Sequence, residues 1–208
     1  MSVKFDSPSV WTASNIALIT MRGKDRISFL HNFCTNDIKK LVDNAVVEAY
    51  ITSIQGKCLG YVSVFQASDE LLLITNDYKT EELAAHLDRY IITEDVEITL
   101  NQKPNCLLFT GEGIEQWLQQ EQPQGTLVAN HWFNQSSYWF FGELSTAQQN
   151  DLQSLTDEQI HAVRIHAGTP IYGDDVTEEN LAQEVNRNQQ AISFTKGCYL
   201  GQEPIARI

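Results

Sequence analysis

The chain has 208 residues, of which 42% are hydrophobic and 10% aromatic, so it has ample material for a buried core. This composition excludes the disordered and fibrous classes. Acidic residues outnumber basic ones by 27 to 14, which gives a net charge of -13. Such a charge repels phosphate backbones and anionic lipids, and it argues against stable, broad nucleic-acid binding.

No apolar run approaches the ~20 residues that a membrane span requires. The first residues, Met1-Ser2-Val3-Lys4-Phe5-Asp6, contain charges and show neither a secretory signal nor a transit peptide. We therefore expect a soluble protein of the cytoplasm that does not contact membranes.

Hydrophobic periodicity predicts an α+β protein, with antiparallel sheets flanked by helices in two successive or intertwined modules. The first module, residues 1–100, is expected to contain strands at 15–21, 46–52, 60–66, 71–75 and 96–100, and helices at 24–41 and 81–91. Its first strand and helix could pack with the second module.

The best linker signal is the polar stretch 101–104, because its proline cannot occupy a central strand. The second module, residues 105–208, is expected to contain strands at 106–110, 126–133 and 138–141 and helices near 112–120 and 146–152. Thr156-Asp157-Glu158-Gln159 then forms a capping box, and the helix that it opens should end at Gly168. Residues 169–193 lack periodicity and exceed the ~12–15 residues of an ordinary connection, which is typical of functional loops.

The four cysteines are too widely spaced for a structural zinc site or a disulfide framework, and the histidines show no metal-binding pattern. Cys34, Cys58 and Cys106 lie in apolar surroundings and are predicted to be buried. Cys198 lies between glycines and next to Lys196, so it could be an exposed thiol with a stabilised thiolate. The alternative is a tight turn in which the glycines are conformational and the cysteine packs.

A resemblance to a known family rests on Lys196-Gly197-Cys198-Tyr199-Leu200-Gly201-Gln202-Glu203. This segment matches the pattern K-G-C-[YF]-x-G-Q-E throughout. Weaker similarities occur in the same order at 23–37, 83–96 and 164–175. Over nearly its whole length, the chain resembles the YgfZ-type folate-binding proteins of iron–sulfur cluster maintenance, in the superfamily of the glycine-cleavage T-protein, an aminomethyltransferase.

The resemblance implies a bound tetrahydrofolate or a derivative. A carboxylate can hold the pterin with two parallel hydrogen bonds, and Glu184 occupies the place of the T-protein glutamate that does so. The alternative is a glutamate on a solvated loop. Lys196 is a further candidate for folate binding, as are Tyr172 and Asp175, which could instead shape the neighbouring turn.

Two arginines are candidate partners for the glutamyl carboxylates of the folate. Arg164 and Arg207 could bind them in a bidentate manner. Each could equally pair with one of the many acidic side chains of the chain.

The chain departs from the T-protein pattern in two places. T-proteins carry an aspartate pair after a glycine-rich element, whereas residues 56–61 here contain no carboxylate. Aminomethyl transfer therefore has no obvious proton-handling group, and whether the protein is an enzyme stays open. Relatives also continue into a C-terminal β-barrel domain, which we expect to be absent here because the sequence stops at Ile208.

The leading hypothesis is a tetrahydrofolate-binding accessory protein that supports iron–sulfur cluster assembly or repair and iron–sulfur-dependent tRNA modification. Cys198 would be its functional thiol, and iron–sulfur proteins or cluster-assembly factors would be its partners. The alternative is a folate-dependent, aminomethyltransferase-like one-carbon transferase. A third possibility is an interaction module that no longer binds folate.

Overall fold

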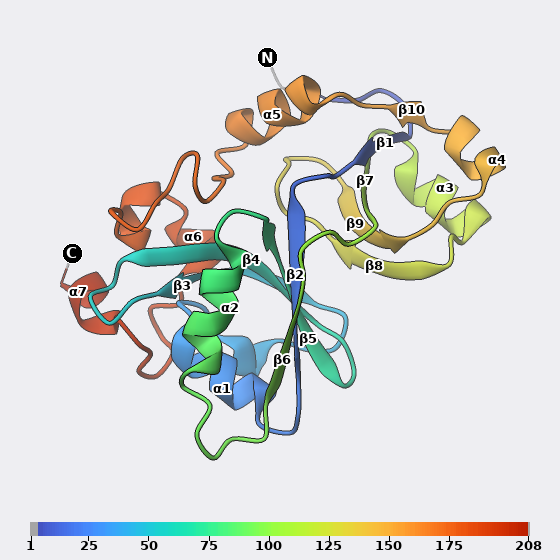
Figure 1. Ribbon diagram of the computed structural model, residues 1–208. Coiled ribbons are helices and arrows are strands. Elements are labelled where there is room, and N and C mark those ends of the chain that lie inside the picture. Colours follow the sequence, from blue (N-terminus) through green and yellow to red (C-terminus); the bar gives the residue numbers. More distant parts are fainter. Residues whose placement is uncertain (1–3, 208) are drawn as a thin grey trace. The chain divides into compact units, whose positions relative to one another are not determined.

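The computed structural model describes residues 4–207, which form two compact units (Figure 1). Unit 1 contains the described residues up to 14 together with 103–169, and unit 2 contains 15–102 together with the described residues from 170 onward. The units are therefore intertwined along the chain. One border coincides with the expected linker at 101–104. The expected modules 1–100 and 105–208 differ from this division at both ends, because the start of the chain joins unit 1 and the final segment joins unit 2.

Unit 2 is built on a five-stranded sheet in which all neighbouring strands are antiparallel. In spatial order the strands are β3 (Val46–Thr52), β4 (Cys58–Gln66), β5 (Glu70–Asn76), β2 (Ile16–Arg22) and β6 (Glu97–Asn101). The helices of the unit are α1 (Arg26–Phe33), η1 (Ile38–Lys40), α2 (Thr80–Asp88), η2 (Ala182–Val185), α6 (Asn188–Ala191) and α7 (Gln202–Ala206).

Both faces of the sheet are covered at β3 and β4, which explains why β4 is buried almost without interruption. On one face, side chains such as Ile51, Val62 and Leu73 form a core with Leu30 of α1 and Leu87 of α2. On the other face, β3 and β4 pack against residues 172–205. The final segment is thus a structural layer of unit 2, and this layer carries the predicted site residues except Arg164.

Unit 1 contains a second five-stranded sheet, whose core includes the buried aromatic side chains of Trp139 and Phe140. In spatial order its strands are β10 (Gln153–Ser154), β1 (Ser9–Thr12), β7 (Cys106–Thr110), β9 (Ser137–Gly142) and β8 (Gly125–Ala129). Its helices are α3 (Ile114–Glu121), α4 (Thr146–Asn150) and α5 (Asp157–His166). Strands β1 and β10 were not predicted from the sequence.

The capping box is confirmed at the start of α5. The hydroxyl of Thr156 accepts a hydrogen bond from the backbone N–H of Gln159 at 3.4 Å, and the Gln159 side chain accepts one from the backbone N–H of Thr156 at 2.9 Å. Beyond the helix, Gly168 has the left-handed φ of 69° that typically ends a helix.

The predicted helix over 24–41 was wrong in its second half, because α1 ends at Phe33. Cys34 pairs with Ile51 in an isolated bridge, and the backbone N–H of Thr35 donates to the carbonyl of Tyr50 at 3.0 Å. Pairing with β3 therefore replaces helical hydrogen bonds. The predicted strand over 126–133 also ends earlier, at Ala129. None of the described helices is long and apolar enough to cross a membrane.

Candidate functional site

Lys196 anchors the segment that carries the cysteine signature to the end of α1. Its ammonium donates to the carbonyl oxygens of His31 at 2.5 Å, Cys34 at 2.7 Å and Asn36 at 2.8 Å, and it lies 4.8 Å from the ring centroid of Tyr199. An ammonium has three protons, so all of them are engaged. Burial lowers the pKa of Lys196. The proposed folate contact of Lys196 does not fit this geometry, since no donor remains, and the residue instead holds the loop in place.

The end of the signature is fixed against the turn that precedes β4. The hydroxyl of Thr52 donates to the carbonyl of Leu200 at 2.7 Å. Gly201 has a φ of +81°, and a Cβ there would lie 2.2 Å from the carbonyl oxygen of Ser53. Only glycine tolerates this approach. A Cβ on Gly197, in contrast, would meet no heavy atom within 4 Å.

Cys198 lies between these two anchors and is the one exposed thiol among the four cysteines. The other three are buried. Burial raises the pKa of Cys34 to about 11 and that of Cys58 to about 12, and it also raises the pKa of Cys106. Since the thiolate is the reactive form, the fold suppresses the reactivity of the three buried thiols and leaves that of Cys198 accessible.

Glu184 lies in η2, and its side chain is exposed. Its Oε2 accepts a hydrogen bond from the backbone N–H of Leu181 at 2.8 Å, and no described group donates to its Oε1. The segment runs beside the start of β4, where the N–H of Cys58 donates to the carbonyl of Asn180 at 2.9 Å. After burial, the negative charge of Glu184 is the next cause of the raised pKa of Cys58. Residues 56–61 contain no carboxylate of their own, but the carboxylate of Glu184 lies close enough to act on Cys58 within this stretch.

The turn at 53–57 contacts both the segment that contains Glu184 and the segment that contains Cys198. On one side Lys57 forms a bridge with Leu181, three residues before Glu184. On the other side a Cβ on Gly56 would lie 3.0 Å from the carbonyl oxygen of Gly201, three residues after Cys198. The fold thus brings the two segments to the same turn.

Tyr172 and Asp175 shape the loop beside this turn. The carboxylate of Asp175 accepts from the backbone N–H of Ile171 at 2.8 Å. The hydroxyl of Tyr172 donates to the carbonyl of Cys58 at 3.3 Å, and Asn76 donates to the carbonyl of Tyr172 at 2.6 Å. Burial raises the pKa of Tyr172 to about 12. Both side chains therefore have partners within the loop and the adjoining strand. These contacts fit the alternative that Tyr172 and Asp175 shape the turn.

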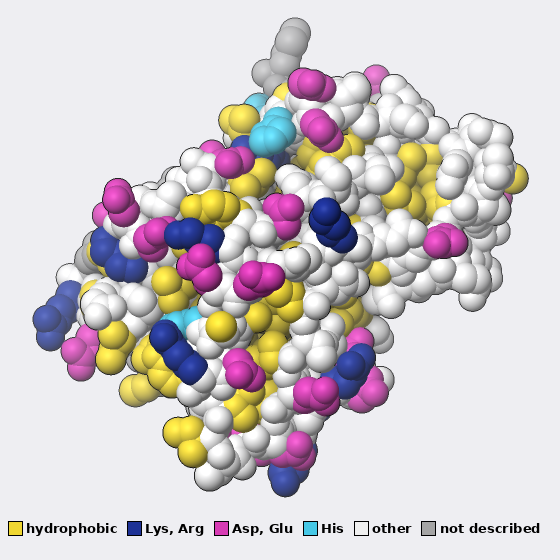
Figure 2. Space-filling view, viewed as in Figure 1, with side chains coloured by type: hydrophobic (Ala, Val, Ile, Leu, Met, Phe, Trp, Pro, Cys, Tyr) yellow, Lys and Arg dark blue, Asp and Glu magenta, His cyan; other side chains and the backbone are white. Residues whose placement is uncertain are grey.

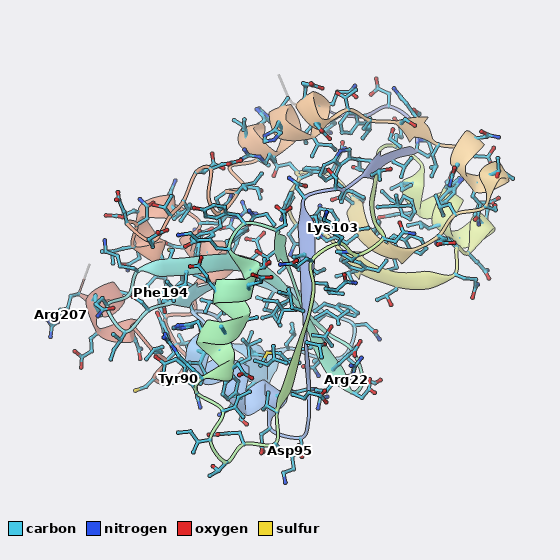
Figure 3. The ribbon with its side chains drawn as sticks, in the orientation of Figure 1. Arg22, Tyr90, Asp95, Lys103, Phe194 and Arg207 are labelled. Carbon is cyan, nitrogen blue, oxygen red and sulfur yellow. The ribbon has the colours of Figure 1, made fainter. Side chains whose placement is uncertain are left out.

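The two candidate arginines belong to different units. Arg164 is buried in unit 1, where it donates to the carbonyl of Thr169 at 3.1 Å and to Nδ1 of His161. These contacts engage its guanidinium inside the unit, so its predicted contact with a folate carboxylate finds no support. Arg207 follows α7 in unit 2, and its side chain is exposed (Figure 3).

Sequence reasoning missed a buried ion pair that fastens this segment to the sheet. Arg187 donates to the two oxygens of Glu48 at 2.6 and 2.8 Å, and its Nε also lies 3.0 Å from the hydroxyl of Tyr61. The side chains of Arg187 and Glu48 are only 7% and 1% exposed. The sequence did contain a signal for this pair. Glu48 is a charged residue inside an otherwise apolar strand, 46–52, and Arg187 is the one basic residue of 170–195.

A cavity of about 580 Å³ lies in unit 2 between α2, the start of β4 and the loop that contains Tyr172. It is lined by Ser53, Leu59, Lys79, Glu82, Leu83, Ala85, His86, Arg89, Tyr172 and Glu178. Neither Glu184 nor Cys198 is among these residues. Tyr172 is the one predicted site residue that reaches the cavity, and sequence reasoning did not single out the others.

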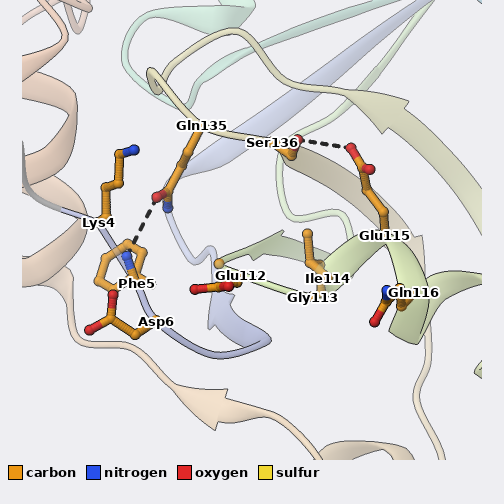
Figure 4. Close-up of a pocket in the computed structure, with 11 residues that line it drawn as sticks. Lys4, Phe5, Asp6, Glu112, Gly113, Ile114, Glu115, Gln116, Gln135 and Ser136 are labelled. Carbon is orange, nitrogen blue, oxygen red and sulfur yellow. Dashed lines mark hydrogen bonds between the residues drawn. The ribbon is translucent and has the colours of Figure 1, made fainter.

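A second cavity, of about 470 Å³, lies in unit 1 at the start of α3 (Figure 4). Its lining includes the acidic residues Asp6, Glu112 and Glu115 and the basic residue Lys4, so its net charge opposes an anionic ligand. It contains none of the predicted site residues. No group of three or more metal-binding side chains occurs in the described part of the chain. On the face drawn in Figure 2, basic side chains are scattered among acidic ones rather than gathered into one patch.

Three buried polar atoms of β3, η2 and α6 lack partners among the described residues. They are the hydroxyl of Tyr50, Oε1 of Gln183 and Oδ1 of Asn188. Buried polar groups are normally satisfied, so such atoms suggest a missing water or ligand. Oxygens of this kind are the acceptors that the N–H donors of a pteridine edge require, but neither they nor Oε1 of Glu184 line the cavities described above. The chemistry of these side chains is compatible with a folate.

Comparison with known proteins identifies the relatives of this chain. No family model matches it. The tRNA-modifying protein YgfZ of Aliivibrio fischeri (strain MJ11) is 27% identical over 92% of this chain and 64% of the relative. The protein of the same name from Hamiltonella defensa is 29% identical over 91% of this chain and 62% of the relative. Over most of its length the chain is therefore similar to proteins named tRNA-modifying protein YgfZ. It spans a little under two thirds of the length of these relatives.

The fold agrees with that expected from the YgfZ resemblance. The crystal structure of the glycine cleavage system aminomethyltransferase T from Bartonella henselae superposes with a TM-score of 0.77 at 12% sequence identity. The match covers 98% of this chain and 63% of that protein. At this identity the likeness establishes the T-protein fold alone.

Proposed function

We propose that this chain binds a tetrahydrofolate and supports iron–sulfur-dependent tRNA modification through the thiol of Cys198. The observation that carries the proposal is the exposure of this single thiol on a segment anchored at both ends, by Lys196 and by Gly201. A rigid scaffold that presents one reactive group is typical of functional sites. The relatives named tRNA-modifying protein support the cellular role.

The folate supplies a reduced one-carbon carrier, and the residues near η2 would hold its pteridine. Glu184 keeps one carboxylate oxygen free for a ring N–H, and the buried oxygen of Gln183 offers a second acceptor. Cys198 would supply a sulfur for contact with an iron–sulfur cluster or with a cluster-assembly partner.

The thiol is tested in cells that lack their own YgfZ protein. Cys198→Ser should fail to restore the tRNA modifications, measured by mass spectrometry of nucleosides, whereas Cys106→Ser should restore them, because Cys106 is buried in unit 1. In vitro, iodoacetamide should label the native chain once, at Cys198. Full restoration by Cys198→Ser would overturn the role of the thiol.

The folate is tested by calorimetry with tetrahydrofolate. We expect binding by the native chain and weaker binding by Glu184→Gln, because the amide replaces one acceptor oxygen with a donor. Glu179→Gln, at an exposed position of the same loop, is the matched control. Absence of binding to the native chain would refute the folate site.

The position of Glu184 favours a second candidate, a folate-dependent one-carbon transferase. Its charge acts on Cys58, within the stretch where T-proteins carry their aspartates. This candidate requires turnover of methylenetetrahydrofolate with an acceptor amine, and loss of that turnover in Glu184→Gln. Absence of any turnover leaves the accessory role.

A further inference from the structure

The described strands form two sheets with four edge strands, and three of these edges are protected against pairing with another chain. An edge strand presents unpaired backbone N–H and C=O groups, which proteins usually cover, shorten or charge. In unit 2, residues 35 and 36 cover the edge of β3 through hydrogen bonds to Glu48 and Tyr50. The other edge, β6, carries the charge of Glu97. In unit 1, the edge strand β10 is only two residues long.

The fourth edge, β8, shows none of these features. It is the outer strand of the unit 1 sheet and pairs only with β9 among the described strands (Figure 1). The strand contains no charged residue and no proline, and its register with β9 runs without interruption. Its first three residues are exposed, among them the apolar Leu127 at 39%. The wider segment 122–130 also lacks Asp, Glu, Lys and Arg, although the chain has a net charge of -13.

The ladder between β8 and β9 shows which backbone groups point outward. Asn130, directly after β8, donates its N–H to the carbonyl of Ser137 on β9 at 2.8 Å. Hydrogen-bonded pairs alternate along an antiparallel ladder, so only the even-numbered residues of β8 bond to β9. The N–H and C=O groups of Gly125, Leu127 and Ala129 therefore point away from β9, and no described residue bonds to them.

These outward groups are complementary to a second copy of themselves. When two β8 strands lie antiparallel with Leu127 opposite its own counterpart, Gly125 of one copy faces Ala129 of the other. Every outward N–H then meets an outward C=O. The exposed side chains of Leu127 meet across the two-fold axis, on the face where Phe140 lies opposite Leu127. The same register therefore satisfies the backbone and brings apolar side chains together.

Charge selects a second copy as the occupant of this edge. A net charge of -13 repels another copy over most of the surface, and the repulsion is smallest where the chain carries no charge. A basic partner would be attracted to the exposed carboxylates and would gain nothing from an uncharged strand. The absence of charge along β8 therefore suits a partner with the same sign of charge, which the chain itself is.

We propose that two copies of this chain associate through antiparallel pairing of β8, which joins the two unit 1 sheets into one. The contact is isologous and closed, because each copy has one such edge and uses it fully. The interface is small, so the dimer should be weak, with a dissociation constant of about 10 to 500 µM. The inference concerns unit 1 and depends neither on the proposed folate binding nor on Cys198.

Sedimentation equilibrium of the full chain over a series of concentrations tests the association. We expect a monomer–dimer equilibrium that ends at the dimer. It should strengthen as sodium chloride is raised from about 0.05 to 0.5 M, because salt screens the like charges of the two copies. A chain that stays monomeric at about 1 mM would overturn the proposal. So would association that continues beyond the dimer or that weakens as salt is added.

Two variants locate the contact. Leu127→Pro removes an outward N–H and leaves the hydrogen bonds to β9 in place, whereas Leu127→Lys places like charges at the two-fold axis. Each should raise the dissociation constant by about tenfold or more, while native tryptophan fluorescence shows that unit 1 is folded. Thr99→Lys, at an exposed position of the β6 edge in unit 2, should leave the constant unchanged. Unchanged association in Leu127→Lys, or an equal loss in Thr99→Lys, would overturn the role of β8.

Amide exchange followed by nuclear magnetic resonance tests the register. Exchange at Leu127 and Ala129 should slow in step with the fraction of dimer, since their N–H groups become bonded there. Exchange at Val128 should be slow at every concentration, because its N–H already donates to β9. Exchange at Leu127 that does not change as the dimer forms would contradict the proposed pairing.

Discussion

Arg187 and Glu48 form a buried, two-pronged ion pair between the final segment and strand β3, with N–O distances of 2.6 and 2.8 Å. The partners are 139 positions apart in the sequence. The pair fastens the layer that carries Glu184 to the sheet. Because each charge is desolvated, each depends on the other.

Replacing one partner should therefore destabilise unit 2 strongly. We expect Arg187→Met to lower the free energy of unfolding by about 3 to 5 kcal/mol, because it leaves the carboxylate of Glu48 buried and unpaired. The double variant Glu48→Met with Arg187→Met should lose less than the single variant. A loss below about 1 kcal/mol in the single variant would contradict this reading of the pair.

Unfolding of the two units can be followed separately. All four tryptophans, Trp11, Trp117, Trp132 and Trp139, lie in unit 1, so tryptophan fluorescence reports on that unit alone. Tyr138 is the one tyrosine of unit 1, and the other six of the seven lie in unit 2. The near-ultraviolet dichroism of tyrosine therefore reports mainly on unit 2.

Lys196→Met should loosen the signature segment. Its loss leaves the carbonyls of His31, Cys34 and Asn36 without their donor, and we expect a loss of about 2 kcal/mol in the stability of unit 2. Lys24→Met, at a side chain that is 77% exposed, should change stability by less than about 0.5 kcal/mol. Equal effects in chemical denaturation would argue against the anchoring role.

The two glycines of the signature should respond differently to alanine. Gly201→Ala requires a left-handed φ and places a Cβ 2.2 Å from the carbonyl oxygen of Ser53, so we expect a loss of at least about 3 kcal/mol. Gly197→Ala meets no atom within 4 Å and should be close to neutral. The measurement is the denaturation midpoint of unit 2. If Gly201→Ala were tolerated as well as Gly197→Ala, the packing of this turn would be wrong.

His86 should make the stability of unit 2 depend on pH. Burial lowers its folded pKa to about 4, from 6.5 in the unfolded chain, so the unfolded state binds the proton more readily between these values. The stabilising contribution is therefore complete above pH 6.5 and is lost as the pH falls to about 4, with an upper limit of about 3 kcal/mol.

The His86→Gln variant tests this dependence by comparison with the native chain. Between pH 7 and 4, its unfolding midpoint by tyrosine dichroism should fall less steeply. His166→Gln, at an exposed residue of unit 1, should follow the native profile. Parallel profiles for His86→Gln and the native chain would exclude the assigned linkage.

Local chemistry determined several features of this protein. Hydrophobic periodicity indicated the strands at 46–52, 60–66 and 71–75 of unit 2, and the capping box at Thr156 set the start of α5. Apolar neighbours indicated that Cys34, Cys58 and Cys106 are buried, and flanking glycines indicated an accessible Cys198. Each of these depends on residues only a few positions apart, which a sequence displays directly.

Only the tertiary structure decided what the charged residues of the site do. The ammonium of Lys196 contacts the carbonyl of His31, which is 165 positions away in the sequence, and not the thiol of the nearby Cys198. The pairing of Arg187 with Glu48 and the meeting of Arg89, His86 and Tyr172 at one cavity depend on how the final segment packs against the sheet. Such partners are set by long-range packing, because hydrogen bonds and ion pairs act over a few ångströms regardless of distance along the chain.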